Sequence, residues 1–429
     1  MNLALAGCII VFVLIFILRM PISMGMIAAG ATYLLIKGAD LSMVSNQIIN
    51  ALYTNFVIIA VPLFIFTANV MNTGKVSNMI FNFAKSIIGR VRGALGYVNV
   101  VDSIVYAGTT GSAIACCAAL AKIEIKAMSD SGFDPEFACA VSATSSILGV
   151  IYPPSIPLIL YAMLSSTSVG ALFLGGVIPA TILAIALMIY VGIVSNKRKY
   201  PMGDRLKLKV FLHQTWISIP ALLTPVVLLA GIYTGVMTPT EAGAAAGFYA
   251  ILITVFAYRA LGPKDLLKVA VASLKDIGGI SIIVGAAAII SYVFAREQIA
   301  ITVGNWIISI TSSKWSFLLL TNIVLLIIGL AIDTTIILLI FVPILLPVAS
   351  ALGVDLIHFG VVVVFNCMIG LCTPPFGMLL FITSSVSGTS LKKVIREIWL
   401  PVIAMIIVLF ILTYIPVTVT FFPKLVGLM

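Results

Sequence analysis

Apolar runs, separated by short polar segments, follow one another from one end of the chain to the other. Examples are residues 3–18, 56–70, 171–194, 216–232, 277–294, 317–332 and 401–415. Several of these runs approach the roughly 20 residues that a helix needs to cross a bilayer. A membrane β-strand would instead alternate apolar and polar residues over about ten positions. The pattern therefore predicts an all-α, polytopic membrane protein.

Two apolar segments are interrupted by adjacent prolines, in "GVIYPPSIPLIL" (149–160) and "GLCTPPFGMLLF" (370–381). A proline inside a helix costs about 3 kcal/mol, because it removes a hydrogen bond and clashes with the preceding turn. At membrane depth, broken backbone is tolerated only where protein or a wet cavity satisfies it. We expect each pair to interrupt a helix so that freed carbonyls and helix ends bind an ion or a ligand. The simpler alternative is a kink.

The double prolines belong to a longer internal repeat, because Pro374 follows Pro153 by 221 positions. The same spacing links three further pairs of landmarks: Gly132 with Gly353, Asp134 with Asp355, and Gly149 with Gly370. Each half thus carries a Gly-x-Asp loop, a long apolar segment and then the proline break. Interrupted segments at corresponding positions of two halves point to the binding site of a secondary transporter.

A cluster of positive charge, "NKRKYPMGDRLKLK" at residues 196–209, lies at mid-chain. Because cytoplasmic loops of membrane proteins are enriched in Lys and Arg, we place this cluster in the cytoplasm. We predict two inverted repeats, residues 1–200 and 213–429, joined by a cytoplasmic linker at 201–212. Each repeat would begin with scaffold helices and end with a hairpin and a broken helix, at 94–128 and 136–165 in the first and at 316–350 and 356–386 in the second.

Composition agrees with the membrane prediction. Of the 429 residues, 62% are hydrophobic and only 9% are charged, whereas soluble domains carry about 25% charged residues. The net charge of +10 would suggest nucleic acid in a soluble protein. Here it marks cytoplasmic loops, so we expect no nucleic-acid partner.

Motifs for other chemistries are missing from the sequence. The six cysteines lie in apolar or small-residue segments without a CxxC pair, where free cysteine behaves as a small hydrophobe. We expect neither a disulfide nor a cysteine or histidine metal site. A phosphate loop, a GxSxG elbow and an HExxH pair are also missing, so we expect no ATP hydrolysis and no hydrolytic enzyme.

A small polar island precedes each proline break, in "YAGTTGSAIA" (106–115) and in "GLAIDTTIILLIFVP" (329–343). The 221-residue spacing aligns Ser112 with Asp333. The flanking apolar runs are too short to span separately, so they predict re-entrant helical hairpins with these islands at the tips. A carboxylate within the membrane is a functional-site hypothesis by default. Asp333 would also cap the helix that follows it, and the two roles are compatible.

Several of these stretches resemble the large membrane subunit of tripartite ATP-independent periplasmic (TRAP) transporters, of the dicarboxylate and sialic acid type. They are "TTGSAIACCAAL", "SATSSILGVIYPPSIPLILYAMLSSTSVGALFLGGVIPA", "GIYTGVMTPTEAGAAAGFYA" and "NCMIGLCTPPFGMLLF". The resemblance implies a multi-pass protein of the bacterial inner membrane that works with a small four-helix membrane subunit and a periplasmic substrate-binding protein. It implies sodium-driven import of a small organic acid, such as sialic acid or a C4-dicarboxylate. The implied fold is of the elevator type, in which a domain of two hairpins and two broken helices moves against a scaffold.

Other readings of the sequence remain open beside this one. The nearest alternative is a stand-alone sodium- or proton-coupled organic-anion symporter that needs no binding protein. A membrane-embedded enzyme would place paired acids, or His with an acid, inside its helices, and a channel has no need of duplicated broken helices. We therefore expect a transporter and not an enzyme.

The first predicted hairpin departs from the family pattern. After "GSA" the family commonly has an acidic residue, where this chain has Cys116. Asp102 is an unusual charge on the same hairpin and would be placed to compensate. Glu124 and Lys126 would either pair across a helix turn or face the loop that carries Asp130.

We expect at least two sodium sites, each between one hairpin tip and one broken helix. The first would use Gly108, Thr109, Thr110, Ser112, Ser145 and Pro153, with backbone near Val150. The second would use Asp333, Thr334, Thr335, Asn366, Cys372 and Thr373. The competing account is that these hydroxyls satisfy their own helix backbones, as Ser and Thr often do.

Substrate binding is expected near the breaks, at Pro154, Ser155 and Pro375, and at Arg296 in "YVFAREQIA". An arginine presents a planar fork that matches a carboxylate through two hydrogen bonds. The alternative for Arg296 is an interfacial side chain that reaches water, with Glu297 neutralising it. In "TPTEAGAAAGFYAI" (238–251), Thr238, Pro239 and Glu241 predict a helix that begins with a capping box.

Overall fold

The computed structural model describes residues 2–18, 20–54, 57–72, 74–310 and 313–429. Phe56, the first residue of one predicted apolar run, lies outside this set. The described chain is helical almost throughout and contains no β-sheet. Six of its helices are long and apolar enough to cross a membrane, and three bent helix pairs raise that number to as many as nine. The prediction of an all-α polytopic membrane protein is confirmed.

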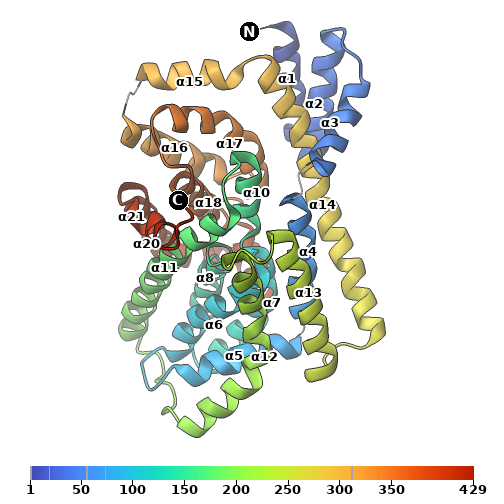
Figure 1. The fold of residues 1–429 in the computed structure, drawn as a ribbon. Coiled ribbons are helices and arrows are strands. Elements are labelled where there is room, and N and C mark those ends of the chain that lie inside the picture. The colour runs from blue at the N-terminus through green and yellow to red at the C-terminus, as the bar shows by residue number, and fades with distance from the viewer. Residues whose placement is uncertain (1, 19, 55–56, 73, 311–312) are drawn as a thin grey trace.

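One group of helices precedes the hairpin and the broken helix of each half along the chain. These are α1 (Leu3–Ile17), α2 (Ile22–Ile36), α3 (Ser42–Tyr53), α4 (Val57–Met71), α5 (Gly74–Ile87), α12 (Leu208–Tyr233), α13 (Pro239–Leu252), α14 (Pro263–Arg296) and α15 (Ile299–Ile310). The long helix α14 runs along one side of the molecule and contacts α2, α3 and α4 (Figure 1). A short π-helical turn, Ile253–Ala257, continues α13.

The remaining helices occur in two series with the same order. The first series is α6 (Ala94–Thr110), α7 (Ala113–Asp130), α8 (Pro135–Ser145), α9 (Leu148–Ile151), α10 (Ile156–Ser165) and α11 (Val169–Arg198). The second is α16 (Lys314–Gly329), α17 (Thr334–Ala351), α18 (Leu356–Gly370), α19 (Met378–Ser387) and α20 (Leu391–Tyr414), followed by α21 (Val417–Leu425). Helices α7 and α8 begin 221 positions before α17 and α18, so the sequence repeat is also a repeat of helices.

Local backbone chemistry explains why the two series match. Gly132 and Gly353 both have positive φ, of 89° and 66°, in the loop before α8 and α18. Glycine adopts this left-handed conformation without the steric cost that other residues incur. Asp134 and Asp355 then stand at the N-caps of the two helices. The loop that the Gly-x-Asp pattern predicts is therefore present in both halves.

Each proline pair separates two helices, as the sequence suggests. In the first series, α8 and α9 together are bent by 41° against α10, which begins after Pro153 and Pro154. In the second, α18 ends at Gly370 and α19 begins at Met378. Backbone groups at such a break lack helical partners and need protein or water around them. The first break is buried from Pro153 to Ser155, whereas Pro375 and Phe376 of the second break are exposed.

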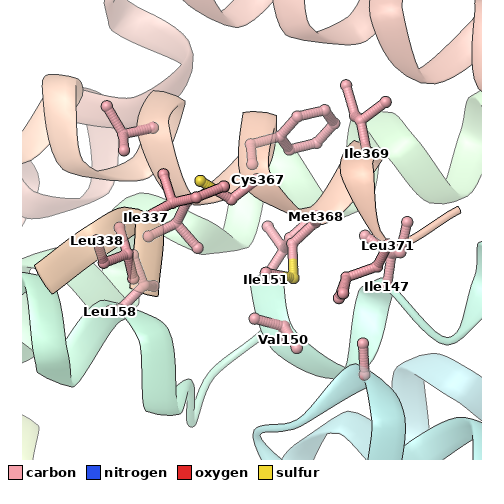
Figure 2. Close-up of a cluster of buried hydrophobic side chains, with 14 of the residues drawn as sticks. Ile147, Val150, Ile151, Leu158, Ile337, Leu338, Cys367, Met368, Ile369 and Leu371 are labelled. Atoms are coloured by element: carbon pink, nitrogen blue, oxygen red, sulfur yellow. The ribbon is translucent and has the colours of Figure 1, made fainter. Parts of the chain in front are cut away.

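The two series interlock through apolar side chains at the breaks. Figure 2 shows Val150, Ile151 and Leu158 of the first series beside Ile337 and Met368 of the second. All five side chains are at most 2% exposed. Burying a side chain of this size contributes roughly 1.5–3 kcal/mol relative to leaving it in water. The two broken helices are thus held in one common core.

One face of the long helix α11 is apolar and exposed. On α11, Ile185, Ile189 and Ile193 are 53%, 57% and 60% exposed and follow one another at intervals of four residues. This spacing puts them on one helix face. An apolar stripe that the protein leaves uncovered suits contact with lipid hydrocarbon.

The mid-chain segment connects α11 to α12. Arg198, at the end of α11, donates from Nη2 to both carboxylate oxygens of Glu397 at 2.7 and 2.9 Å and from Nη1 to Asp134 at 3.0 Å. These bonds join α11 to α20 and to the N-cap of α8. Helix α12 begins at Leu208, inside the stretch 201–212 that we predicted as a linker.

The helix start at Thr238 has the predicted capping box. The Thr238 backbone N–H donates to Glu241 Oε2 at 2.8 Å, and the Glu241 N–H donates to Thr238 Oγ1 at 3.3 Å. Pro239 occupies the first turn, where no backbone donor is needed. This prediction is confirmed, and Glu241 has a structural role.

Candidate functional site

A cavity of about 260 Å³ lies where the two hairpin tips face the two broken helices. The tips contribute Gly111, Ser112, Ala113 and Ile114, and Asp333, Thr334 and Thr335; the broken helices contribute Val150, Ile156, Pro157, Met368 and Leu371. Helix α14 closes one side with Ile280 and Ile283. The structure therefore brings both polar islands of the sequence to one space, although they are 221 positions apart.

Helix ends of both polarities open onto this cavity. The N-terminal turns of α7, α10 and α17 line it, through Ala113, Ile156 and Thr334 among others. The C-terminal ends of α9 and α18 line it through Val150 and Met368. Free N–H groups and a partial positive charge at an N-terminus favour an anion, whereas carbonyls at a C-terminus favour a cation. The cavity can therefore hold both kinds of ion.

The first tip is held to its broken helix by the main chain. The Ile156 N–H donates to the Gly111 carbonyl at 3.1 Å. Gly111 has a φ of 61°, and a Cβ at this position would lie 3.0 Å from the Pro154 carbonyl oxygen. Ser112 follows as N-cap of α7 and accepts from the Ala115 N–H at 3.4 Å. Glycine is required at the tip because both the conformation and the close contact exclude a side chain.

The second tip is held mainly by side chains. Asp333 caps α17 and accepts from the Thr335 N–H at 2.8 Å, so the capping role is confirmed. Thr334 Oγ1 lies 3.5 Å from the Cys367 carbonyl oxygen of α18. Gly329 and Gly370 bring α16 and α18 into direct backbone contact, since a Cβ on Gly370 would lie 2.5 Å from the Gly329 oxygen.

Two predicted sodium ligands carry buried oxygens that have no hydrogen-bond partner among the described residues. They are Thr110 Oγ1 in the first half and Asn366 Oδ1 in the second, on residues that are 1% and 0% exposed. Asn366 uses its amide group as a donor to the Asn322 backbone and side-chain oxygens, at 3.0 Å each. An unpaired buried acceptor is costly, so these oxygens mark places where a cation would be stabilised.

Other predicted ligands are satisfied by the protein itself. Thr109 donates to the Tyr106 carbonyl and Thr373 to the Ile369 carbonyl, both at 2.7 Å. These two bonds match the competing account, in which hydroxyls satisfy their own helix. Cys372 lies 3.4 Å from the Ala143 carbonyl oxygen, and Ser145 donates to Asn99 at 2.5 Å.

The structure does not bring every predicted site residue to the cavity wall. Gly108 packs against α12, where a Cβ would lie 2.6 Å from the Pro225 ring. Ser155 is buried and caps α10 by accepting from the Leu158 N–H at 3.3 Å. Outside the wall lie Gly108, Thr109, Thr110, Ser145, Pro153, Pro154, Ser155, Arg296, Asn366, Cys372, Thr373 and Pro375.

Arg296 is the last residue of α14, and its side chain is exposed. Its Nη1 donates to the Tyr292 hydroxyl at 2.7 Å. Glu297 does not form an ion pair with Arg296: it pairs with Lys37 at 2.9 Å and accepts from the Tyr33 hydroxyl at 2.6 Å. Arg296 follows directly after Ala295, which lines a separate cavity of about 450 Å³ between α3, α10 and α14.

Sequence reasoning missed the contribution of α14. Ile280 lines the 260 Å³ cavity and also an adjoining cavity of about 420 Å³, which contains Asn69, Asn72 and Asp276 opposite Ser112. Asn69 donates to Asp276 at 2.9 Å. The signal in the sequence was Asp276 itself, a carboxylate directly before the long apolar part of α14 at residues 277–294.

The structure shows where the unusual residues of the first hairpin lie. Glu124 is buried and accepts from Asn99 at 2.9 Å, whereas Lys126 is exposed. Both expectations for this pair are therefore wrong, because Glu124 points into the protein interior. It faces neither Lys126 nor the loop. Asp102 and Cys116 interact electrostatically, so the carboxyl group at 102 is close to the position of the missing acid.

Comparison with known proteins places this geometry in a family. The DctM component of tripartite ATP-independent periplasmic transporters matches residues 9–418. The chain is 34% identical over 410 residues to the sialic acid TRAP transporter large permease protein SiaM of Vibrio cholerae, with 95% of each chain covered. It is 36% identical over 374 residues to the C4-dicarboxylate TRAP transporter large permease protein DctM of Pseudomonas aeruginosa, with 87% of this chain and 88% of the relative covered.

A solved structure shows a similar fold. The YdaH transporter of Alcanivorax borkumensis covers 87% of this chain and 88% of its own length, with a TM-score of 0.64 at 11% identity. The family match and the two permease relatives confirm the resemblance that the sequence motifs suggested, and these relatives are transporter permeases and not enzymes. The chain is a multi-pass membrane protein, and it belongs to the DctM family, the large permease component of TRAP transporters.

Proposed function

We propose that this permease imports a small organic anion of the sialic acid or C4-dicarboxylate class, driven by sodium, across the bacterial inner membrane. The observation that carries the proposal is the cavity onto which three helix N-termini and the Asp333 carboxylate open together. The N-termini of α7 and α17 provide backbone N–H groups for a carboxylate without a fixed positive charge, and α10 adds the partial positive charge of its first turn. The two relatives named above carry carboxylate substrates in their names, which supports this substrate class.

The position of Asp333 supports coupling to a cation. A carboxylate in the wall of the cavity repels an anionic substrate, and a bound cation removes this repulsion. Near the two tips, Thr110 and Asn366 supply buried acceptors that no residue in the described part of the chain bonds. We place one sodium ion near Thr110 and Ser112 and a second near Asp333, Thr334 and Asn366. Thr335 already lines the cavity beside Asp333, whereas the predicted ligands outside the cavity wall other than Thr110 and Asn366 would join these sites only if the hairpins rearrange.

Electrical energetics favour more than one sodium ion. A positive charge that enters down a potential of about 100 mV releases about 2.3 kcal/mol, and an anion that moves with it opposes the field by a similar amount for each negative charge. Two or more sodium ions therefore give net inward drive for a singly charged acid. We further propose that the hairpins and broken helices move as one unit against α14 and its neighbours, in an elevator-type cycle.

Reconstitution tests the proposal directly. The permease would be placed in proteoliposomes with its small four-helix subunit, and the cognate periplasmic binding protein would be added outside. Uptake of labelled N-acetylneuraminate and of labelled succinate is then measured with and without an inward sodium gradient. We expect one of them to accumulate only when sodium and the binding protein are both present. Equal uptake without the binding protein would instead show a stand-alone symporter, and uptake without any ion gradient would refute coupling.

Arg296 is proposed to attract the substrate carboxylate at the neighbouring cavity. Arg296→Lys keeps the charge and removes the two-pronged hydrogen bonding, so the substrate concentration for half-maximal uptake should rise about tenfold, equivalent to 1.4 kcal/mol. Sodium dependence and thermal stability should stay unchanged. The matched control is Arg205→Lys, in the exposed segment before α12. An unchanged substrate affinity in Arg296→Lys would remove Arg296 from the substrate path.

A further inference from the structure

A second polar cluster lies inside the first hairpin, away from the cavity wall. It contains Asn99 and Asp102 of α6, Glu124 of α7, and Ser142 and Ser145 of α8. All five residues are at most 1% exposed. None of them lines the cavity between the two tips. The proposed substrate site therefore leaves this cluster without a role.

Asn99 organises the cluster through its amide group. Its Nδ2 donates to Glu124 Oε2 at 2.9 Å and to Ser142 Oγ at 2.6 Å, and its Oδ1 accepts from Ser145 Oγ at 2.5 Å. An asparagine amide has two donor hydrogens, and both are used here. Asn99 has no donor left for Asp102.

Asp102 is the unexplained member of the cluster. It lies three residues after Asn99 on α6, so the two side chains share a helix face. Both Asp102 carboxylate oxygens and Glu124 Oε1 are buried, with no hydrogen-bond partner in the described chain. Asp102 and Glu124 also interact electrostatically with each other. Two like charges in a dry interior are strongly unfavourable unless a positive charge accompanies them.

No basic side chain supplies that charge within the described residues. The titratable groups that face the pair are Tyr106 on α6 and the thiols of Cys116 and Cys117 on α7, which are neutral when protonated. Helices α4, α9 and α19 carry no charged residue, and α8 contributes hydroxyls, with Glu136 in its first turn. The basic residues of α20, which packs against α8, are all exposed: Lys392, Lys393 and Arg396. The basic groups of α5, α7, α11 and α12 are exposed or bonded elsewhere: Lys75, Lys85, Lys122, Lys126, Lys197, Arg198, Lys209 and His213.

We propose that Asp102 and Glu124 together bind one proton, and that this proton keeps the hairpin competent for uptake. A proton needs no cavity, and the described residues contain no group of three His, Cys, Asp or Glu side chains that would hold a metal ion. Donors favour the charged form of a carboxylate, so Glu124 holds the negative charge and Asp102 takes the proton. The uptake part of this inference rests on the proposed function, and the presence of the proton does not.

The sign of the pH effect follows from the charges. At a pH low enough for the pair to keep its proton, the cluster holds a single negative charge. At a pH high enough to remove that proton, both carboxylates are charged and the packing of α6, α7 and α8 is destabilised. Uptake should therefore fall as pH rises, by up to about tenfold per pH unit for a single proton. Asp102→Asn imitates the protonated acid and should retain its acidic-pH uptake rate at alkaline pH.

Infrared spectroscopy of the lipid-reconstituted complex detects the proton without using transport. The wild-type protein should show the C=O stretch of a buried neutral carboxyl group, which decreases as pH rises. This band should vanish in Asp102→Asn and persist in the control Asp130→Asn, which changes an exposed carboxylate at the end of α7. Glu124→Gln provides a second variant, which should hold Asp102 neutral across a wider pH range.

The two readouts separate the possible failures. Absence of the band from the wild-type protein, or its persistence in Asp102→Asn, would overturn the proton site even if sodium-driven uptake is intact. The same conclusion follows if Asp102→Asn keeps the wild-type pH profile, or if it changes the sodium dependence and not the pH dependence. If the transporter shows no sodium-coupled uptake at all, the infrared result still decides whether the pair binds a proton.

Discussion

Asp333→Asn should raise the sodium concentration needed for half-maximal uptake by about ten- to a hundredfold. A hydrogen bond or contact with a charged partner is worth about 1.5–3 kcal/mol, and each 1.4 kcal/mol is a factor of ten. Asparagine retains an oxygen that can accept from the Thr335 N–H, which Asp333 now does at 2.8 Å, so the helix start should survive. The measurement is initial uptake against sodium concentration in proteoliposomes.

Two controls make this result interpretable. Ser112→Ala changes the corresponding residue of the first tip, which contributes a neutral oxygen, and should therefore have a smaller effect. Asp265→Asn removes an exposed carboxylate at the start of α14 and should have none. Unchanged sodium affinity and unchanged steepness in both Asp333→Asn and Ser112→Ala would show that the tips do not bind sodium.

Gly370→Ala should destabilise the contact between α16 and α18 and with it the second half of the protein. A Cβ at this position would lie 2.5 Å from the Gly329 oxygen, 2.9 Å from its carbonyl carbon and 3.0 Å from its Cα. All three are backbone atoms, so no flexible side chain can move aside. Overpacking of this kind costs about 1–3 kcal/mol even where side chains adjust. We expect a lower unfolding temperature of the purified protein and loss of uptake.

The matched control is Gly278→Ala on α14, where a Cβ would meet nothing within 4 Å. Alanine favours a helix over glycine by up to about 1 kcal/mol, so this variant should be as stable as the wild type or more so. A Gly370→Ala protein with unchanged unfolding temperature would show that α16 and α18 separate readily at this point.

Because of the repeat, much of this fold could be predicted from the sequence. Helix breaks at Pro153 and Pro374 follow from proline chemistry, and the 221-residue spacing alone puts Ser112 and Asp333 at equivalent positions of the two halves. These inferences succeed because they depend on local backbone rules. The structure confirms that Asp333 caps its helix, and it adds that Ser112 does the same and that both residues line one cavity.

Contacts between side chains of different helices could not be predicted in the same way. The direction of the Glu124 side chain depends on Asn99 and Ser142, which come from neighbouring helices of the hairpin region. The same holds for Gly108, whose small size serves contact with Pro225 of α12. Helix periodicity shows which residues share a face, but it does not tell which neighbour that face will meet.

The two hairpin tips differ in how far they tolerate mutation. The first is fastened to its broken helix by the bond from the Ile156 N–H to the Gly111 carbonyl, in which both partners are main-chain atoms. Such a bond survives almost any replacement of the Ile156 side chain other than proline. The second tip approaches α18 through the Thr334 hydroxyl, which few other residues reproduce. Replacing the side chain at position 156 therefore leaves the bond of the first tip in place, whereas replacing Thr334 removes the contact of the second tip.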